Sequence, residues 1–138
     1  MSSTKSPIQC LPLTLQELEE TNQALMYSEA GFIHQRGACR HPYHRVGVAI
    51  HGGNGNQVSR HQIYVRNLSV TGAAVLYMVA SAEESTLKLI LIGSDSLPYE
   101  TECKVVRCEH VGNGLFDIGL RFKEEITEED MAVLMGAL

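Results

Sequence analysis

The feature that most constrains the fold is a series of short apolar segments, rich in Val and Ile, that begins near Arg45 and ends near Phe122. Turn-forming residues separate these segments, as in GGNGN at 52–56 and GNG at 112–114. Short β-branched runs bounded in this way are typical of a small antiparallel barrel or sandwich, and GNG predicts a tight hairpin. Six strands fit a closed antiparallel β-barrel, so the sequence predicts a mainly β fold. The expected strands span residues 45–51, 61–68, 73–79, 86–92, 102–110 and 115–122.

A helix is expected before the barrel. Thr14 and Glu17 form a capping box, in which the hydroxyl and the carboxylate each satisfy a backbone donor at a helix start. Gly31 suits the end of the same helix, which should cover about residues 14–30. Its apolar side chains should fall near one face. These side chains are Leu15, Leu18, Leu25 and Met26.

A second, short helix is expected at the C-terminus. Thr127 is a good cap residue, and the acidic residues that follow it suit the positive end of a helix. The chain therefore divides into an N-terminal extension (1–31), a barrel with its lead-in segment (32–123) and a C-terminal helix (124–138).

The bulk properties narrow the classes of function. At 138 residues the chain has the size of one domain. Its net charge of −5 gives no general attraction to DNA, RNA or an anionic membrane, so an anionic ligand must be bound by local cations. The first residues show no leader pattern, and no apolar run reaches the length of a membrane span. We therefore expect a cytoplasmic protein whose four cysteines are reduced thiols.

Two polar motifs could bind such a ligand. The lead-in FIHQRGACRHPYH at 32–44 has no steady period, and Arg36 and Arg40 form R-x-x-x-R within it. A guanidinium presents a planar fork of donors that can hold phosphate oxygens or stack on a base. Further along, Asn67, Ser69 and Gly72 form N-x-S-x-x-G at an expected turn, where side-chain oxygens could contact a base edge. Each motif alone is weak support for a binding site.

The combination of the two motifs, in this order and around this barrel, resembles the PilZ domain, a bacterial receptor for cyclic di-GMP. The final segment CKVVRCEHVGNGLFDIGLRF is also similar to the closing strands of that family. The resemblance implies that Arg36 and Arg40 hold the phosphates and stack on guanines, while Asn67 and Ser69 contact a guanine. It implies cyclic di-GMP as the ligand, bound as one molecule or as an intercalated dimer. The lead-in would fold over the ligand and signal to an unidentified protein effector.

The sequence departs from the family pattern at two points. Position 35 is Gln where the family often has a further arginine, which removes one cation from the site. By spacing, Arg45 could take the place given to Arg40, and His41 would then replace the leading arginine. We favour Arg36 and Arg40 because they satisfy the pattern intact, and keep Gln35 and Arg45 as auxiliary candidates.

A metal site is an alternative use of the lead-in. Cys39, His41 and His44 give the pattern C-x-H-x-x-H, which Cys10 or His34 could complete as a tetrahedral zinc site. The spacing matches no standard zinc finger, and a thiol with exposed imidazoles is the simpler interpretation. A zinc-responsive module therefore stays an alternative function.

Enzyme activity is not expected, because no nucleophile elbow, P-loop or H-E-x-x-H motif occurs. No catalytic cofactor is expected either. Cys103 and Cys108 lie an odd number of positions apart on one expected strand, so they should face opposite sides. A ligand-independent adaptor of the same fold is the other alternative. In either role the chain would be a monomer or homodimer, with no DNA or RNA partner and no membrane insertion.

Overall fold

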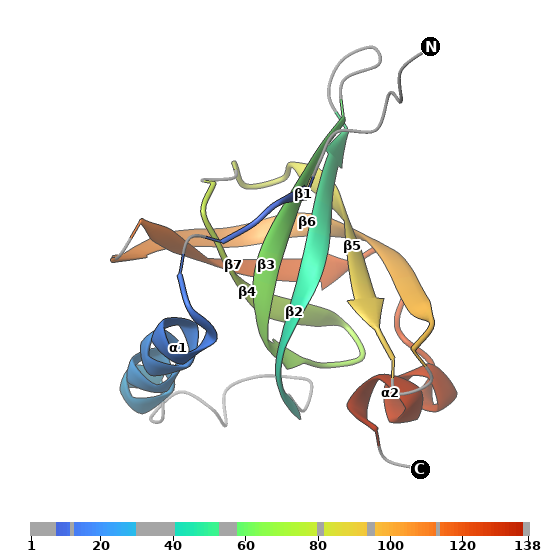
Figure 1. Cartoon of the computed structure of the whole chain (residues 1–138). Coiled ribbons are helices and arrows are strands. Elements are labelled where there is room, and N and C mark those ends of the chain that lie inside the picture. Colours follow the sequence, from blue (N-terminus) through green and yellow to red (C-terminus); the bar gives the residue numbers. More distant parts are fainter. Residues whose placement is uncertain are drawn as a thin grey trace.

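The structure is a computed structural model, and it describes residues 8–11, 13–29, 41–52, 58–79, 82–93, 96–112 and 114–136. Within these ranges, six antiparallel strands form a closed barrel (Figure 1). The strands follow one another around the barrel in the order β3-β2-β5-β6-β7-β4, and β4 pairs back with β3. The six-stranded barrel predicted from the sequence is confirmed. Its strands are β2 (His41–Gly52), β3 (Val58–Leu68), β4 (Gly72–Tyr77), β5 (Thr86–Ile92), β6 (Pro98–Gly112) and β7 (Leu115–Phe122).

A short additional strand, β1 (Ile8–Gln9), pairs in parallel with β3. It extends the sheet beyond the barrel and was not predicted, because two residues carry no detectable period. The GNG segment joins β6 to β7 as the predicted hairpin, with Gly112 paired to Leu115. Gly112 and Gly114 have φ values of 97° and 73°, which other residues adopt only with strain.

The barrel encloses one apolar core and carries a second on its outer surface. Away from the register shifts, alternate residues of the barrel strands point inward, and among the described residues many of the inner ones are fully buried. The strand β4 is buried on both faces, because its inner face contributes to the core and its outer face lies under a helix. The outer cluster comprises Leu11, Leu18, Tyr64, Leu76 and Leu115.

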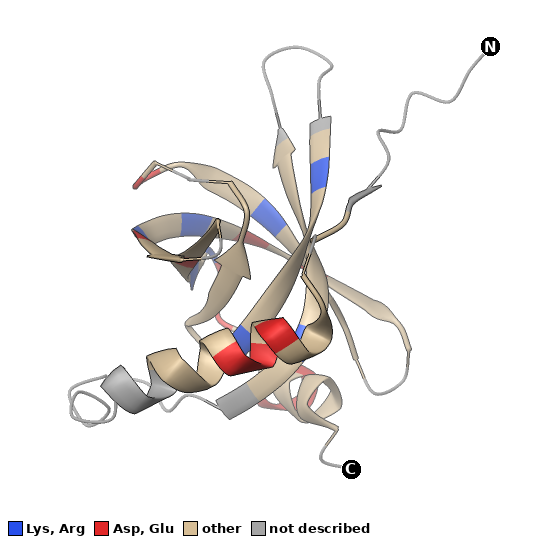
Figure 2. Ribbon diagram, turned by 60° about the vertical axis from the view of Figure 1, so that its left-hand side comes forward, with Lys and Arg blue, Asp and Glu red and all other residues tan. Residues whose placement is uncertain are grey.

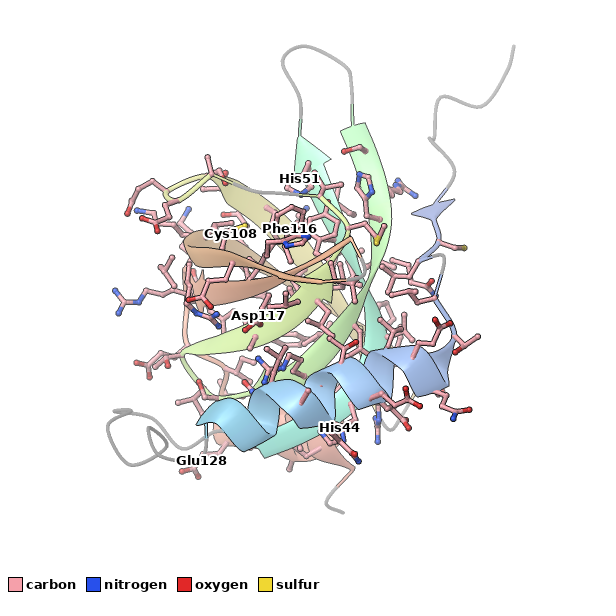
Figure 3. The ribbon with its side chains drawn as sticks, turned by 90° about the vertical axis from the view of Figure 1, so that its left-hand side faces the viewer. His44, His51, Cys108, Phe116, Asp117 and Glu128 are labelled. Carbon is pink, nitrogen blue, oxygen red and sulfur yellow. The ribbon has the colours of Figure 1, made fainter. Side chains whose placement is uncertain are left out.

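The helix α1 (Leu15–Glu29) packs on the outside of the barrel through this second cluster (Figures 1 and 3). Its predicted capping box is present: the Thr14 hydroxyl accepts from the Glu17 N–H at 3.1 Å, and the Glu17 carboxylate accepts from the Thr14 N–H at 3.0 Å. Leu18 is buried at 3% exposure, whereas Leu15 is 51% exposed. The prediction that Leu15 shares the packed face is therefore wrong, because this residue lies where the helix begins and points to solvent.

The helix α2 (Glu128–Met135) closes one end of the barrel. Its predicted cap is present, since the Thr127 hydroxyl accepts from the Asp130 N–H at 3.1 Å. Met131 and Leu134 are buried against the barrel core. Gly136 ends the helix in the left-handed conformation, with φ 72°.

A bulge in β6 alters one prediction. The pairing of β6 with β7 shifts between Val105 and Arg107, which reverses the alternation of side chains beyond this point. Cys103 is buried in the core, and Cys108 packs against the same core. The expectation that the two cysteines face opposite sides is therefore wrong, because it assumed an unbroken strand.

No helix within the described ranges is long and apolar enough to cross a membrane.

Candidate functional site

The turn between β3 and β4 is built by the hydroxyl of Ser69. The Ser69 Oγ accepts from the backbone N–H of Thr71 at 3.2 Å and of Gly72 at 3.1 Å. The Ser69 N–H donates to the Gly72 carbonyl at 2.8 Å, which closes the turn. Ser69 is only 3% exposed. One hydroxyl has two acceptor positions, so both are filled inside the turn.

Gly72 allows the turn to lie against β7. A Cβ at this position would be 2.1 Å from the Leu120 carbonyl oxygen, a contact that no side chain can make. The Thr71 carbonyl accepts from the Phe122 N–H at 2.8 Å, and the Val70 carbonyl accepts from the Ile126 N–H at 2.9 Å. The turn is thus fastened to the end of β7 and to the segment before α2.

The start of β2 lies beside this turn. His41 pairs with Leu68, and Pro42 pairs with Asn67. A register shift follows between Pro42 and Arg45, and His44 takes a φ of 52° there. The prediction that the irregular lead-in extends to His44 is therefore wrong, since residues 41–44 already belong to β2. The bulge conceals this strand in the sequence, because it breaks the alternation of apolar and polar residues.

Arg45 contacts a neighbouring aromatic ring and the helix α2. Its guanidinium lies 5.2 Å from the centre of the Tyr43 ring, and its Nη1 donates to the Leu134 carbonyl of α2 at 3.4 Å. The Tyr43 hydroxyl donates to the Ile92 carbonyl at 2.8 Å. Burial raises the pKa of Tyr43, and the charge of Arg45 acts in the opposite direction. The other predicted cations, Arg36 and Arg40, and the neighbouring Gln35 lie outside the described residues.

A buried charged network joins α1 to the barrel next to the turn. Arg66 is 1% exposed, and its Nη1 donates to both carboxylate oxygens of Asp117 at 3.0 Å. Its Nε donates to the Asn22 Oδ1 of α1 at 2.7 Å. The Arg107 Nη1 reaches the same carboxylate at 2.9 Å. Figure 3 shows Asp117 on the side of the barrel that α1 covers.

This network was not predicted from the sequence. A signal for it existed, because Arg66 directly follows the apolar run IYV and Asp117 stands between Phe116 and Ile118. Charges in such positions are rarely buried unless they are paired. The sequence does not state that these two strands bring their charges to the same place.

The comparisons with known proteins agree with the barrel fold. Residues 34–137 match the family model described as PilZ domain. The chain belongs to the PilZ domain family. The match covers both motifs of the predicted ligand site and continues through α2. No curated protein sequence matches the chain.

Two solved structures share the PilZ fold. One is the inhibitor of motility MotI/DgrA from Bacillus subtilis, with 21% identity and a TM-score of 0.53 over 72% of this chain. The chain spans 47% of that protein. The other is the PilZ domain of YcgR from Escherichia coli with c-di-GMP, with 13% identity and a TM-score of 0.52. That likeness covers 75% of this chain and 91% of the YcgR domain.

The zinc candidates of this PilZ domain are only partly described. Within the described ranges, no three His, Cys, Asp or Glu side chains are placed to share a metal ion. Cys10 and His44 are exposed. His34 and Cys39 lie outside the described residues, as does the side chain of His41. The zinc hypothesis therefore stays a prediction.

Two histidines lie at the opposite end of the PilZ barrel from α2 (Figure 3 labels one of them, His51). The rings of His51 and His61 both contact Tyr77, with centroids 5.5 and 5.3 Å away. Burial lowers the pKa of His51, and the charge of His61 lowers it further. Burial also lowers the pKa of His61 and raises that of Tyr77. Protonation of this pair is therefore unfavourable in the folded protein.

Proposed function

We propose that this PilZ domain is a receptor for cyclic di-GMP. Its site would consist of the lead-in with Arg36 and Arg40 and the turn with Asn67, Ser69 and Gly72. Family membership and the solved YcgR domain with c-di-GMP support the ligand class. The single observation that carries the proposal is the pairing of His41 with Leu68, because it joins the end of the lead-in to the start of the turn.

Chain length limits how far the predicted cations can lie from the turn. Arg40 is bonded directly to His41, and consecutive Cα atoms are about 3.8 Å apart. Arg36 is five residues before His41, and five residues span at most about 18 Å even when fully extended. The chain is therefore short enough for both guanidinium groups to reach a dinucleotide lying against the turn. Two cations on one short segment suit a ligand that carries two phosphate charges.

The turn residues would have different roles in this site. Gly72 fixes the turn against β7, and Ser69 uses its hydroxyl to hold the turn together. We propose that Asn67 supplies the amide that contacts a guanine edge, because it is half-buried beside the start of β2. A direct contact between Ser69 and the ligand stays a prediction.

Arg45 would have an auxiliary role. Its guanidinium contacts Tyr43 and the last turn of α2, so reaching a ligand would require it to leave the Leu134 carbonyl. In the alternative site, His41 and Arg45 replace Arg36 and Arg40. Forming it would break the contacts of Arg45 with Tyr43 and α2, whereas the favoured site leaves them in place. A ligand that recruited Arg45 would loosen α2.

We infer that ligand binding changes the conformation of the lead-in and that a partner protein detects the change. The lead-in follows α1, and α1 is docked through Asn22 and Arg66, next to Asn67. A receptor of this kind would act in the cytoplasm, as a monomer or homodimer, and would not transform its ligand. The ligand-independent adaptor is a second candidate, because the turn and the Arg66 network are satisfied by the protein itself.

Isothermal titration calorimetry with cyclic di-GMP tests the proposal. We expect saturable binding by the parent chain and at least tenfold weaker binding by Arg36→Ala and Arg40→Ala, since a charge-assisted hydrogen bond contributes about 1.5–3 kcal/mol. Lys88→Ala is the matched control, because Lys88 is an exposed cation on β5 with a partner of its own, Glu100. No saturable heat with the parent chain would favour the adaptor. Equal binding by both arginine variants would refute the assigned clamp.

A further inference from the structure

Arg121 occupies a position next to the proposed site that neither sequence motif includes. It pairs directly with Gly72, the last residue of the turn motif. Paired residues on antiparallel strands have Cα atoms about 5 Å apart. Its neighbours Leu120 and Phe122 are buried in the barrel core, so the Arg121 side chain points outward, where it is exposed. The guanidinium therefore projects from the outer surface beside the turn.

Arg121 has no ion pair with any described residue, unlike four cations on β5, on β6 and directly after β7. Its counterparts each have a carboxylate partner: Lys88 with Glu100, Lys104 with Glu84, Arg107 with Asp117, and Lys123 with Glu102. Lys104 lies directly opposite Arg121 on β6. Like charges in directly opposed positions destabilise a sheet. Since Lys104 has its own partner in Glu84, the charge of Arg121 is the one left without an ion pair among the described residues beside Gly72.

A groove on the outer surface begins at Arg121. It has a volume of about 860 Å³ and runs over β5, β6 and the end of β7. Lys88, Lys104, Arg121 and Lys123 line it, against the carboxylates of Glu84 and Glu102. The lining is therefore net positive, although the chain has a net charge of −5. Figure 2 shows the contrast between the strands, which carry blue cationic positions, and α1, which carries red acidic ones.

We propose that Arg121 is a third arginine of the ligand site, which binds a phosphate of the dinucleotide held against the turn. This inference rests on the proposed function and deepens it. A guanidinium at this position offers a bidentate fork to a phosphate without first breaking an internal pair. It also supplies a cation on the side of the turn away from the lead-in. This cation could compensate for Gln35, which stands where the family often has a further arginine. The ligand would then lie between the lead-in and β7.

Calorimetric titration of Arg121→Ala and Arg121→Lys tests the inference, at low and at moderate salt. We expect Arg121→Ala to bind cyclic di-GMP about tenfold more weakly, with a smaller dependence of affinity on salt. Arg121→Lys keeps the charge but loses the fork, and should recover part of the affinity. Lys88→Ala, at the other end of the same groove, should bind within about twofold of the parent. Thermal unfolding should be unchanged in all three variants, because both side chains are exposed.

The outcomes separate this inference from the proposed function. Parent-like affinity in Arg121→Ala, with weakened binding in Arg36→Ala, would overturn the role of Arg121 and leave the receptor function standing. Equal weakening in Arg121→Ala and Lys88→Ala would also overturn it, because general attraction by the groove would then be the cause. A parent chain that does not bind cyclic di-GMP would refute the proposed function and this inference together. A ligand-induced shift of the Arg121 Nε–H resonance in NMR spectra would support direct contact.

Discussion

Replacing Arg66 by Met should remove the polar connection between α1 and the barrel while keeping an unbranched side chain of similar length. Arg66 lies at the centre of the buried network, with Asp117 on one side and Asn22 on the other. The variant leaves the Asp117 carboxylate with Arg107 as its remaining charged partner within the described part of the chain. It also leaves Asn22, which is 2% exposed, without this hydrogen bond.

These contacts determine the expected loss in the free energy of unfolding. Removing one partner of a buried ion pair costs about 3–5 kcal/mol, and the lower end applies because Arg107 stays at 2.9 Å from the carboxylate. The loss at Asn22 adds about 1 kcal/mol, the lower end of the cost of a buried group left without its partner. We therefore expect a loss of about 4 kcal/mol in the free energy of unfolding. A domain of this kind has about 5–15 kcal/mol in total, so the variant should be only marginally folded.

Urea denaturation followed by circular dichroism measures this loss. The matched control is Arg107→Met, which removes a cation from the same carboxylate but leaves both hydrogen bonds from the Arg66 Nη1 intact. The Arg107 side chain is 30% exposed, so we expect a loss of about 1 kcal/mol. If Arg66→Met lost no more than Arg107→Met, the network would not hold α1 to the barrel and our reasoning would be refuted.

Two further predictions concern the turn and the histidine pair. Gly72→Ala should cost more than about 3 kcal/mol or prevent folding, because its Cβ would lie 2.1 Å from the Leu120 carbonyl oxygen; a denaturation midpoint close to that of the parent would contradict this. Since the pKa of His51 is lowered in the folded state, the unfolded chain binds more protons below about pH 6.5, and stability should fall as the pH is lowered through this value. His51→Gln should reduce the difference in melting temperature between pH 7.5 and pH 5.5, and an unchanged difference would show that other groups cause it.

The sequence predicted the regular elements well because their signals are local. The strands β5 and β7 have the predicted bounds, and the helix expected at about 14–30 occupies Leu15–Glu29. Apolar alternation, capping residues and turn residues act within a few positions of one another, so they can be identified along one segment. The hydrogen-bonded turn around Ser69 belongs to the same group.

The wrong or missing predictions concern features that depend on contacts between parts of the chain that are far apart in the sequence. The bulge near His44 hid the first residues of β2, and the bulge after Val105 reversed the side of Cys108. The connection between Arg66 and Asp117 depends on how β3, β4 and β7 are arranged around the barrel. The position of Arg121 beside Gly72 likewise follows from register alone. Such pairings depend on the register between strands that are distant in the sequence, which the pattern of one segment does not fix.

A crystal structure of the chain with cyclic di-GMP would show where the ligand binds on the barrel. We predict that the dinucleotide lies against the turn of Asn67–Gly72, with the guanidinium groups of Arg36 and Arg40 on its phosphates or stacked on its bases. A ligand bound elsewhere on the barrel, or a lead-in that stays clear of the ligand at the turn, would contradict the account.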